Sequence, residues 1–354
     1  MTAPDQPSAL APTPTPAGLP AGPPALVVTP QHQHGVTLYA HLMASAVEDL
    51  TGRRLRVSSH ELDPVPHPGP PARGHLHFTD RLWGASPEEA ARRIEEIAAH
   101  TAITVTLHDL PQASDGDRNF ARRRDCYRRV IAAAQGVVCN SRHESHLLLE
   151  LVDPGAEAHV IPLPVDTHPD AAARVEPDGS VAVLGFYYPG KGHAEVVHAV
   201  ERIRDDTGMQ LRVAVLGRAS AGHETDLDNL VARAARRGIE VEVAGYLDDA
   251  ALVERCRRAS VAVAAHRHFS ASGSINTWIA AGRRPLVVDG RYTREVAERR
   301  PGTVTLVDPF ELEAAIADAV AAPASTWLDE AAVTGPDTAA VASAYVSWWG
   351  GLQW

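Results

Sequence analysis

The stretch Val181-Ala-Val-Leu-Gly-Phe-Tyr-Tyr-Pro-Gly-Lys-Gly192 joins an apolar run to a turn that contains glycines and a lysine. A continuous run of small and branched apolar residues is typical of a strand that is buried on both faces of a parallel sheet. Helical spacing of apolar residues follows over His193–Thr207. The stretch therefore predicts a strand at Val181–Gly185, a glycine loop that a ligand can approach closely, and a helix. Lys191 supplies a point charge that suits phosphate.

The rest of this half of the chain repeats the alternation of short apolar runs and helical patterns. Further strands are predicted at Leu211–Leu216, Glu240–Ala244, Val261–Ala265 and Pro285–Val288. Helices are predicted at Glu224–Arg237, Asp249–Arg258, Ser274–Ala281, Pro309–Ala321 and Asp337–Trp349. This order of elements is typical of a parallel sheet with helices on both faces.

The first half of the chain shows a second, independent series of the same kind. Its strands are predicted at Ala25–Thr29, Leu55–Ser58, His75–Phe78, Ile103–Leu107, Gly136–Cys139 and His159–Pro162. Its helices are predicted at Val36–Leu50, Pro87–His100, Arg118–Ala134 and Arg142–Val152. The sequence thus predicts an α/β protein with two doubly wound, Rossmann-like domains. Their ligand should bind in the cleft between the domains, at the carboxyl ends of the strands.

Composition sets the domain boundaries that we expect. Residues 1–24 contain eight prolines among small residues, which predicts a disordered tail. The first domain is then expected over residues 25–165, a polar linker over 166–179 and the second domain over 180–336. Residues 337–354 form a separate, aromatic-rich segment.

The net charge and the distribution of apolar residues limit the kinds of binding partner that we expect for this protein. The net charge of −11 argues against attraction to nucleic acid, and no apolar run is long enough for an integral membrane span. The start of the sequence lacks the pattern of a signal peptide, and its three cysteines are widely spaced. We therefore expect a cytoplasmic protein with reduced, buried thiols. The sequence does not indicate an oligomeric state.

Two further patterns have competing interpretations. Three H-x-H pairs (His32/His34, His75/His77 and His266/His268) could bind zinc, but no acidic or cysteine ligands stand at standard spacings beside them. We therefore predict no metal site. Six arginines within Arg118–Arg129 could hold an acidic acceptor or a lipid headgroup, which would place the protein peripherally at a membrane. A solvated helix face is the commoner explanation.

Two segments that follow predicted strands carry side chains suited to a charged ligand. Ser274 is placed to cap the helix after Ser272–Ser274, where free backbone amides and the helix dipole would hold a diphosphate. His108 and Asp109 follow the strand Ile103–Leu107, and an imidazole can donate or accept a hydrogen bond near neutral pH. An ordinary capped helix and a loop histidine are the plainer interpretations.

Several segments between Ala25 and Val288 carry short motifs in a fixed order. They are Pro30-Gln-His-Gln-His-Gly35, His75-Leu-His77, Val105-Thr-Leu-His108-Asp109, Val137-Val-Cys-Asn-Ser141 with Glu144, Val160-Ile-Pro-Leu-Pro-Val-Asp166, Leu184-Gly-Phe-Tyr-Tyr-Pro-Gly-Lys-Gly192, and Gly245-Tyr-Leu247 followed by Ser270–Pro285. Together they resemble the large family four of retaining GT-B glycosyltransferases.

The resemblance implies a metal-independent, hexosyl-type glycosyltransferase that retains anomeric configuration and needs no cofactor. Its donor would be a UDP- or GDP-sugar, and its acceptor a small molecule, a glycan or a lipid-linked compound. It implies that the helix Asp337–Trp349 crosses back to the first, acceptor-side domain, while the second domain binds the donor. The implied site residues are His108 and Asp109 (catalytic), Gly35, Lys191, Ser272, Gly273 and Ser274 (diphosphate), Gly185, Tyr246, Leu247 and Thr277 (nucleotide and ribose), and His77 (acceptor side).

The sequence departs from the family pattern at two places. Phe186 stands where the family usually has arginine, and His266–Trp278 contains neither glutamate of the usual E-x7-E pair. Polar groups of Ser270–Thr277 are expected to replace the glutamates. An inactive GT-B protein that binds a nucleotide or a protein partner is the alternative. A GT-B epimerase or phosphorylase would need a different acid–base set, which the sequence lacks.

Overall fold

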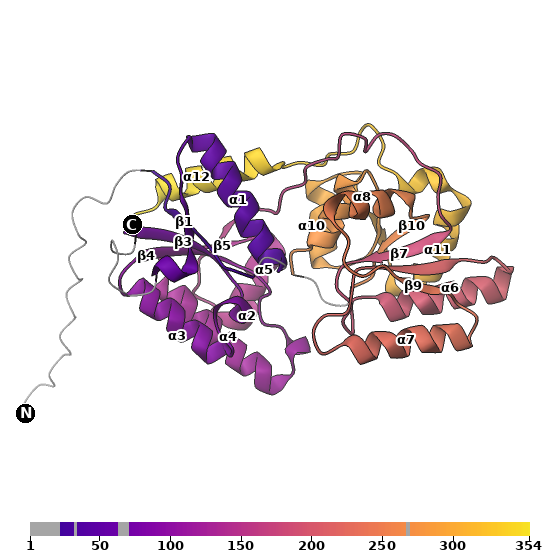
Figure 1. Cartoon of the computed structure of the whole chain (residues 1–354), viewed down its shortest axis with the longest axis horizontal. Helices are drawn as coiled ribbons and strands as arrows, with labels where there is room; N and C mark the ends of the chain where they lie inside the picture. The colour runs from indigo at the N-terminus through magenta and orange to yellow at the C-terminus, as the bar shows by residue number, and fades with distance from the viewer. Residues whose placement is uncertain (1–21, 32–33, 63–70, 267–269) are drawn as a thin grey trace, which may run out of the picture.

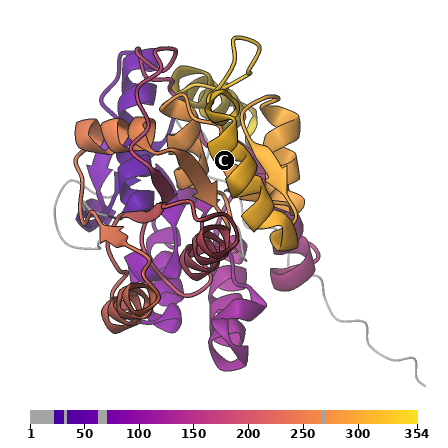
Figure 2. The same ribbon diagram turned by 90° about the vertical axis from the view of Figure 1, so that its right-hand side faces the viewer.

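The computed structural model describes residues 22–31, 34–62, 71–266 and 270–354. These residues form two α/β domains that lie side by side, and Figure 2 views them from the end at which the second domain is in front. Each domain contains one parallel, six-stranded sheet with helices on both faces, so the predicted fold class is confirmed. Most of the tail expected at residues 1–24 lies outside the described residues.

The first domain has the strand order β2-β1-β3-β4-β5-β6. Its strands are β1 (Ala25–Val28), β2 (Arg56–Ser58), β3 (Arg73–Phe78), β4 (Ala102–Leu107), β5 (Gly136–Cys139) and β6 (His159–Val160). Its helices are α1 (Gly35–Thr51), α2 (Asp80–Trp83), α3 (Pro87–Ala98), α4 (Asp117–Ala133) and α5 (Arg142–Leu147). A π-helical turn at Leu148–Val152 continues α5, so the helix expected over Arg142–Val152 is α-helical only in its first part.

Strand β4 shows how the sequence builds both faces of this sheet. Ile103, Val105 and Leu107 alternate with threonines and are fully buried in the core that also contains side chains of α3 and α4. Thr104 and Thr106 point to the opposite face, because successive side chains of a strand alternate. There Thr106 hydrogen-bonds Tyr345, at 2.8 Å between the two hydroxyl oxygens. A buried layer therefore covers each face.

The second domain has the strand order β12-β11-β10-β7-β8-β9. Its strands are β7 (Ser180–Leu184), β8 (Arg212–Leu216), β9 (Val241–Val243), β10 (Val261–Ala264), β11 (Leu286–Val288) and β12 (Thr305–Val307). Its helices are α6 (His193–Thr207), α7 (Glu224–Arg236), α8 (Asp249–Arg258), α9 (Gly273–Ala280), α10 (Arg291–Arg299) and α11 (Leu312–Ala321). One core packs α6, α7 and α11 on the sheet, and the cores on the opposite face contain side chains of α8, α9 and α10.

Helix α10 and strand β12 are absent from the sequence prediction. The buried face of α10 contains Thr293 and Glu295 beside Tyr292 and Val296, so its apolar periodicity is interrupted. Strand β12 is an edge strand that exposes two of its three side chains. Both elements therefore lack the apolar pattern from which the other elements of this sheet were predicted.

Helix α12 (Thr338–Gly351) follows the second domain in sequence but packs on the first. Figure 1 shows it beside α1. Val341, Tyr345 and Trp349 are buried there in one core with side chains of α1 and β1. The chain therefore passes between the domains twice, and the two passages are joined by a hydrogen bond of 2.9 Å from the Val165 amide to the Pro336 carbonyl.

The three cysteines are buried and form no disulfide, as expected. Across the described residues, no helix combines the length and apolar character needed to span a lipid bilayer.

Candidate functional site

The loops that carry the candidate residues lie at the topological switch points of both sheets. In the second domain, β7 and β10 are neighbours whose following helices lie on opposite faces, and their carboxyl ends lead into the Lys191 loop and the start of α9. In the first domain, β1 and β3 have the same relation, and Gly35 follows β1. Such positions are the usual ligand sites of open α/β sheets. The topology thus places several candidates where a ligand is expected.

The Lys191 loop approaches the rest of its domain very closely. Gly185, Gly190 and Gly192 have φ of 109°, 90° and 98°, a region that favours glycine. A Cβ on Gly192 would lie 2.6 Å from the carbonyl oxygen of Ala265, so the loop cannot accept a larger residue there without moving. These glycines bring the lysine over the end of β10.

The ammonium group of Lys191 points toward the start of α9. The side chain is only 8% exposed, and its Nζ donates to Ser274 Oγ at 3.4 Å. Burial lowers the pKa of Lys191 to about 8, and the negative charge of Asp109 in the other domain opposes this shift. Lys191 is therefore a buried cation with a single weak hydrogen bond among the described residues, and it lies within electrostatic reach of the edge of the first sheet.

Helix α9 begins at Gly273, one residue earlier than predicted, and its N-cap is Ser272 instead of Ser274. Ser272 Oγ accepts from the amide of Ile275 at 3.4 Å and lies 3.1 Å from Ser274 Oγ. Ser274 already belongs to the helix, because helical geometry starts at Gly273. The amides of Gly273 and Ser274 therefore lie in the first turn of the helix, where amides lack intrahelical acceptors.

Two candidate glycines are not required by the fold. Among the described residues, a Cβ on Gly273 or on Gly35 would meet no heavy atom within 4 Å, and neither glycine has a positive φ. Each is the first residue of its helix, and His34 Nδ1 caps α1 by accepting from the amide of Val36 at 3.2 Å. No described atom therefore crowds the Cβ position of either glycine, and the first turn of a helix is a usual place for an anion to bind.

His108 belongs to a group of buried histidines in the first domain. His77 Nδ1 lies 3.1 Å from His108 Nε2, so one imidazole donates to the other. His75 forms contacts with Thr104 and Thr106, at 2.9 and 3.1 Å. Burial lowers the pKa of His75 to about 3 and the pKa values of His77 and His108 well below 6.5. All three rings are therefore neutral at pH 7.

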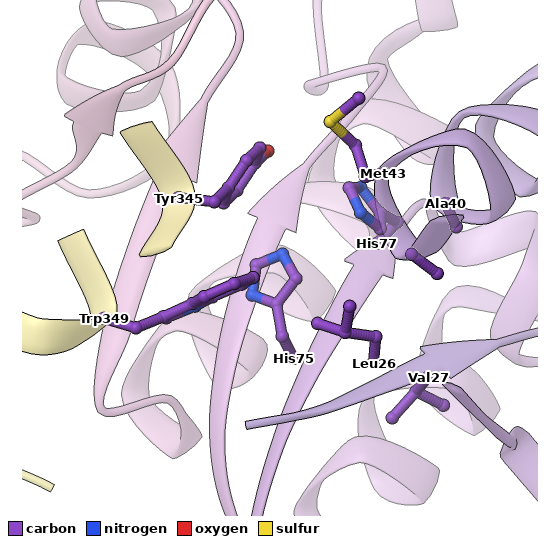
Figure 3. A pocket seen from close by; sticks show the side chains of 9 residues that line it. Leu26, Val27, Ala40, Met43, His75, His77, Tyr345 and Trp349 are labelled. Carbon is purple, nitrogen blue, oxygen red and sulfur yellow. The ribbon is translucent and has the colours of Figure 1, made fainter. Parts of the chain in front are cut away.

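His77 also borders a small cavity, shown in Figure 3. The cavity measures about 10 Å³, close to the least volume that holds one water molecule. Its lining consists of Leu26, Val27, Ala40, Met43, Ala44, His75, His77, Tyr345 and Trp349. His77 thus contacts His108 and the core beneath α1 and α12.

Asp109 is the one described non-glycine residue with a positive φ, at 50°. Its backbone is held in place because Tyr127 Oη donates to the His108 carbonyl at 2.5 Å and Arg123 donates to the Asp109 carbonyl at 2.5 Å. Asp109 is exposed to solvent, yet desolvation by the surrounding protein atoms raises the pKa of its carboxyl, and the charge of Arg123 opposes this shift. Strained backbone held by neighbouring side chains is common at functional sites.

The residues expected at the nucleotide are less closely gathered. Tyr246 is 74% exposed and Leu247 half-buried in the loop after β9. The Thr277 hydroxyl donates back to the Gly273 carbonyl at 3.1 Å, within its own helix. Phe186 lies on the surface beneath the guanidinium of Arg218, 5.5 Å from its ring centre. The lysine loop therefore contacts α9 through Lys191 and Ser274, whereas the described contacts of Thr277 and Phe186 are with Gly273 and Arg218.

Three of the six arginines of α4 form described ion pairs with acids of the same domain. Arg122 and Arg129 form bidentate ion pairs with Glu88 and Glu95 on α3. Arg123 is buried against Asp80. These contacts favour a structural role for this helix face over a site for an acidic acceptor or a lipid headgroup.

Two members of the three H-x-H pairs, His32 and His268, lie outside the described residues. Among the described residues, no three His, Cys, Asp or Glu side chains gather in a way that could hold a metal ion.

Sequence reasoning missed two residues that shape this site. Tyr292 on α10 is buried, and its hydroxyl accepts the amide of Ser272 at 2.8 Å. Glu144 is buried between the domains, where its carboxylate accepts the amide of Ala271 at 3.0 Å. Glu144 stood in a noted motif without a role. A signal for Tyr292 was its i, i+4 spacing with Val296.

No known family model and no curated protein sequence matches this chain. Solved structures do match its fold. HepE of Anabaena, in complex with UDP-glucose, has a TM-score of 0.63 and 15% identity, over 90% of this chain and 94% of HepE. Sucrose-phosphate synthase of Thermosynechococcus elongatus has a TM-score of 0.57 and 17% identity, over 90% and 76%. The UDP-forming α,α-trehalose-phosphate synthase of Burkholderia xenovorans has 0.54 and 14%, over 90% and 78%.

These neighbours are GT-B glycosyltransferases. Because the sequence identities are low, the structural similarity shows only the fold, and the chain has the GT-B fold.

Proposed function

We propose that this protein is a metal-independent glycosyltransferase that moves a sugar from a UDP-sugar to an acceptor with retention of configuration. The observation that carries the proposal is the buried ammonium of Lys191 beside the open start of α9, both at the switch point of the second sheet. Two structures of one neighbour, HepE, in complex with UDP and glucose or with UDP-glucose, support a UDP-linked donor over a GDP-linked one. These neighbours do not favour an inactive binding protein.

The chemistry requires a place for the charge of the leaving diphosphate. As the bond from the anomeric carbon to the phosphate oxygen breaks, its electron pair stays on that oxygen. Lys191 and the free amides at Gly273 and Ser274 can stabilise this charge from fixed positions. The acceptor oxygen forms the new bond to the anomeric carbon, and its proton passes to the departing diphosphate. Front-face transfer of this kind needs no strong protein base.

Residues of the first domain complete the arrangement. His108 and Asp109 follow β4 at the domain junction, and the charge of Asp109 reaches Lys191. A neutral His108 can donate or accept one hydrogen bond to a sugar hydroxyl. Asp109 can accept from the acceptor hydroxyl when it is ionised. We assign the acceptor to this side of the junction.

Transfer should proceed in the presence of a chelator and give the retained anomer. The reason is that fixed positive groups replace the metal at the diphosphate. A thermal-shift panel of nucleotide diphosphates and UDP-sugars identifies the donor, since a ligand of the native state raises the melting temperature. Proton spectra of the first-formed product then report its configuration. Activity lost with chelator and restored by Mg²⁺, or an inverted anomer, would contradict the mechanism.

Gly273→Val should fold like the wild type yet bind UDP at least about tenfold more weakly. Open space surrounds the Cβ position, but branched methyl groups there would obstruct the amides at the start of α9. Gly192→Ala is the matched control, because its Cβ would collide with the Ala265 carbonyl and its φ is 98°. Calorimetry of UDP binding and thermal melts separate the two effects. If Gly273→Val binds UDP normally while Gly192→Ala loses stability, the diphosphate does not bind at α9.

A further inference from the structure

Glu144 joins the two domains at the loop that precedes α9. It belongs to α5 in the first domain and is 1% exposed. Within its own domain it accepts the amide of Asn140 at 2.7 Å. Its other oxygen accepts the hydroxyl of Ser270 and the amide of Ala271, both in the second domain. One buried carboxylate thus receives three hydrogen bonds, two of them from the opposite domain.

A second carboxylate makes the reverse contact. Glu295 on α10 belongs to the second domain and accepts the amides of Arg142 and His143, both at 2.8 Å. These amides form the first turn of α5, the helix that carries Glu144. Each domain therefore provides a carboxylate to backbone groups of the other. This reciprocal arrangement fixes the position of α5 relative to the second domain.

The contacts of Glu144 and Tyr292 fall on consecutive residues. Ser270 and Ala271 are held by Glu144, and the amide of Ser272 is held by the Tyr292 hydroxyl. The next two residues, Gly273 and Ser274, carry the free amides assigned above to the diphosphate. Because the backbone is continuous, the position of these amides depends on the anchored residues before them.

We propose that Glu144 is a positioning residue, which holds the diphosphate-binding start of α9 in place from the opposite domain. This inference rests on the proposed function. Through Glu144, the first domain would contribute to donor binding although this residue does not contact the donor. Glu144 also gives a role to the Ser270 hydroxyl and the Ala271 amide, which belong to the segment that lacks glutamates.

The charge of Glu144 depends on pH within the physiological range. Burial raises its pKa to about 7, whereas the bonds from Ser270, Ala271 and Asn140 oppose the shift. The titratable groups around it include Tyr39, Cys139, Tyr345 and Tyr292, whose pKa values are all raised by burial, so they remain neutral. Asp109 is the neighbouring charge that raises the pKa further. Protonation replaces one acceptor with a donor and weakens the hold on the loop.

The test compares UDP binding by the wild type and Glu144→Gln in calorimetry at pH 8 and pH 6. At pH 8 the variant should bind about tenfold more weakly, since hydrogen bonds to a charged group are lost. At pH 6 the wild-type carboxyl is itself protonated, so the ratio of the two affinities should fall toward one. Titration of UDP and of Lys191 affects both proteins and cancels in this ratio.

Ser270→Ala provides a second variant that leaves the carboxylate in place. It should weaken UDP binding, and its effect should be smaller in the Glu144→Gln background, because both changes remove one shared hydrogen bond. Glu298→Gln is the control: Glu298 lies on α10 but is exposed and contacts only Arg142 among its described partners. It should bind UDP like the wild type.

The outcomes separate the two proposals. If UDP fails to bind the wild type at either pH, the proposed function is wrong and the role of Glu144 falls with it. If UDP binds the wild type, Glu144→Gln and Ser270→Ala equally at both pH values, only the role of Glu144 is wrong. An affinity ratio that stays the same from pH 8 to pH 6 also overturns it, since the charge would then be irrelevant.

Discussion

Lys191→Ala is expected to lower kcat/KM for sugar transfer by about 10²- to 10³-fold, the range found when one fixed donor to a developing anion is removed. Lys191 is the buried cation beside the start of α9, where its Nζ contacts Ser274. A buried ammonium in fixed geometry meets the diphosphate charge without reorganisation. Steady-state kinetics with a saturating acceptor, and calorimetry with UDP, measure the loss.

Arg202→Ala is the matched control, because this arginine lies on α6, the helix that follows the lysine loop, but is exposed and paired with Glu313. It should leave transfer unchanged. The pKa of Lys191 near 8 adds a pH test. Wild-type UDP affinity should fall as pH rises through about 8, because the ammonium loses its proton, and Lys191→Ala should lack this decline. An alanine variant within threefold of wild type would disprove the role.

Trp349→Ala should lower the free energy of unfolding by about 3–5 kcal/mol, the usual cost of truncating a buried tryptophan. Trp349 is buried in the core that α12 shares with α1, beside Met43 and Val47. The loss should therefore appear in the first domain, although the residue follows the second domain in sequence. Urea unfolding followed by circular dichroism measures the change.

Phe310→Ala serves as the control for the same type of truncation, since Phe310 is 97% exposed. It should change stability by no more than about 0.5 kcal/mol. Equal, small effects of the two substitutions would mean that α12 does not complete the core of the first domain in solution.

The fold was predictable because most of its strands have a local run of apolar residues. The run Val181–Leu184 is apolar throughout, and the strand is buried along its whole length. The glycines after it predicted the loop, and the structure gives three of them positive φ. Local patterns of this kind require no knowledge of distant contacts. The position of His108 directly after β4 was likewise predictable from the apolar run that precedes it.

The features that the sequence did not predict depend on contacts between segments that are distant in the chain. Glu295 is buried because it meets backbone amides of Arg142 and His143, more than a hundred residues away, and no local pattern indicates this. The N-cap error at α9 has a similar origin. Ser272 and Ser274 are both good capping residues, and the bond from the Ser272 amide to Tyr292 favours the earlier start. The pairing of Lys191 with Ser274 likewise required the three-dimensional arrangement.

The double passage of the chain between the domains makes the second domain an insertion within the first. During synthesis the strands of the first sheet emerge early. Helix α12, which completes the layer on one face of this sheet, can pack there only after the ribosome has added Trp349. The bond between Thr106 and Tyr345 spans 239 positions in sequence, so its loop closes only after the inserted domain has emerged. Until then the α1 face of the nascent sheet lacks the part of its cover that α12 provides, and apolar side chains of this core stay exposed. The domain that is translated first is therefore completed last.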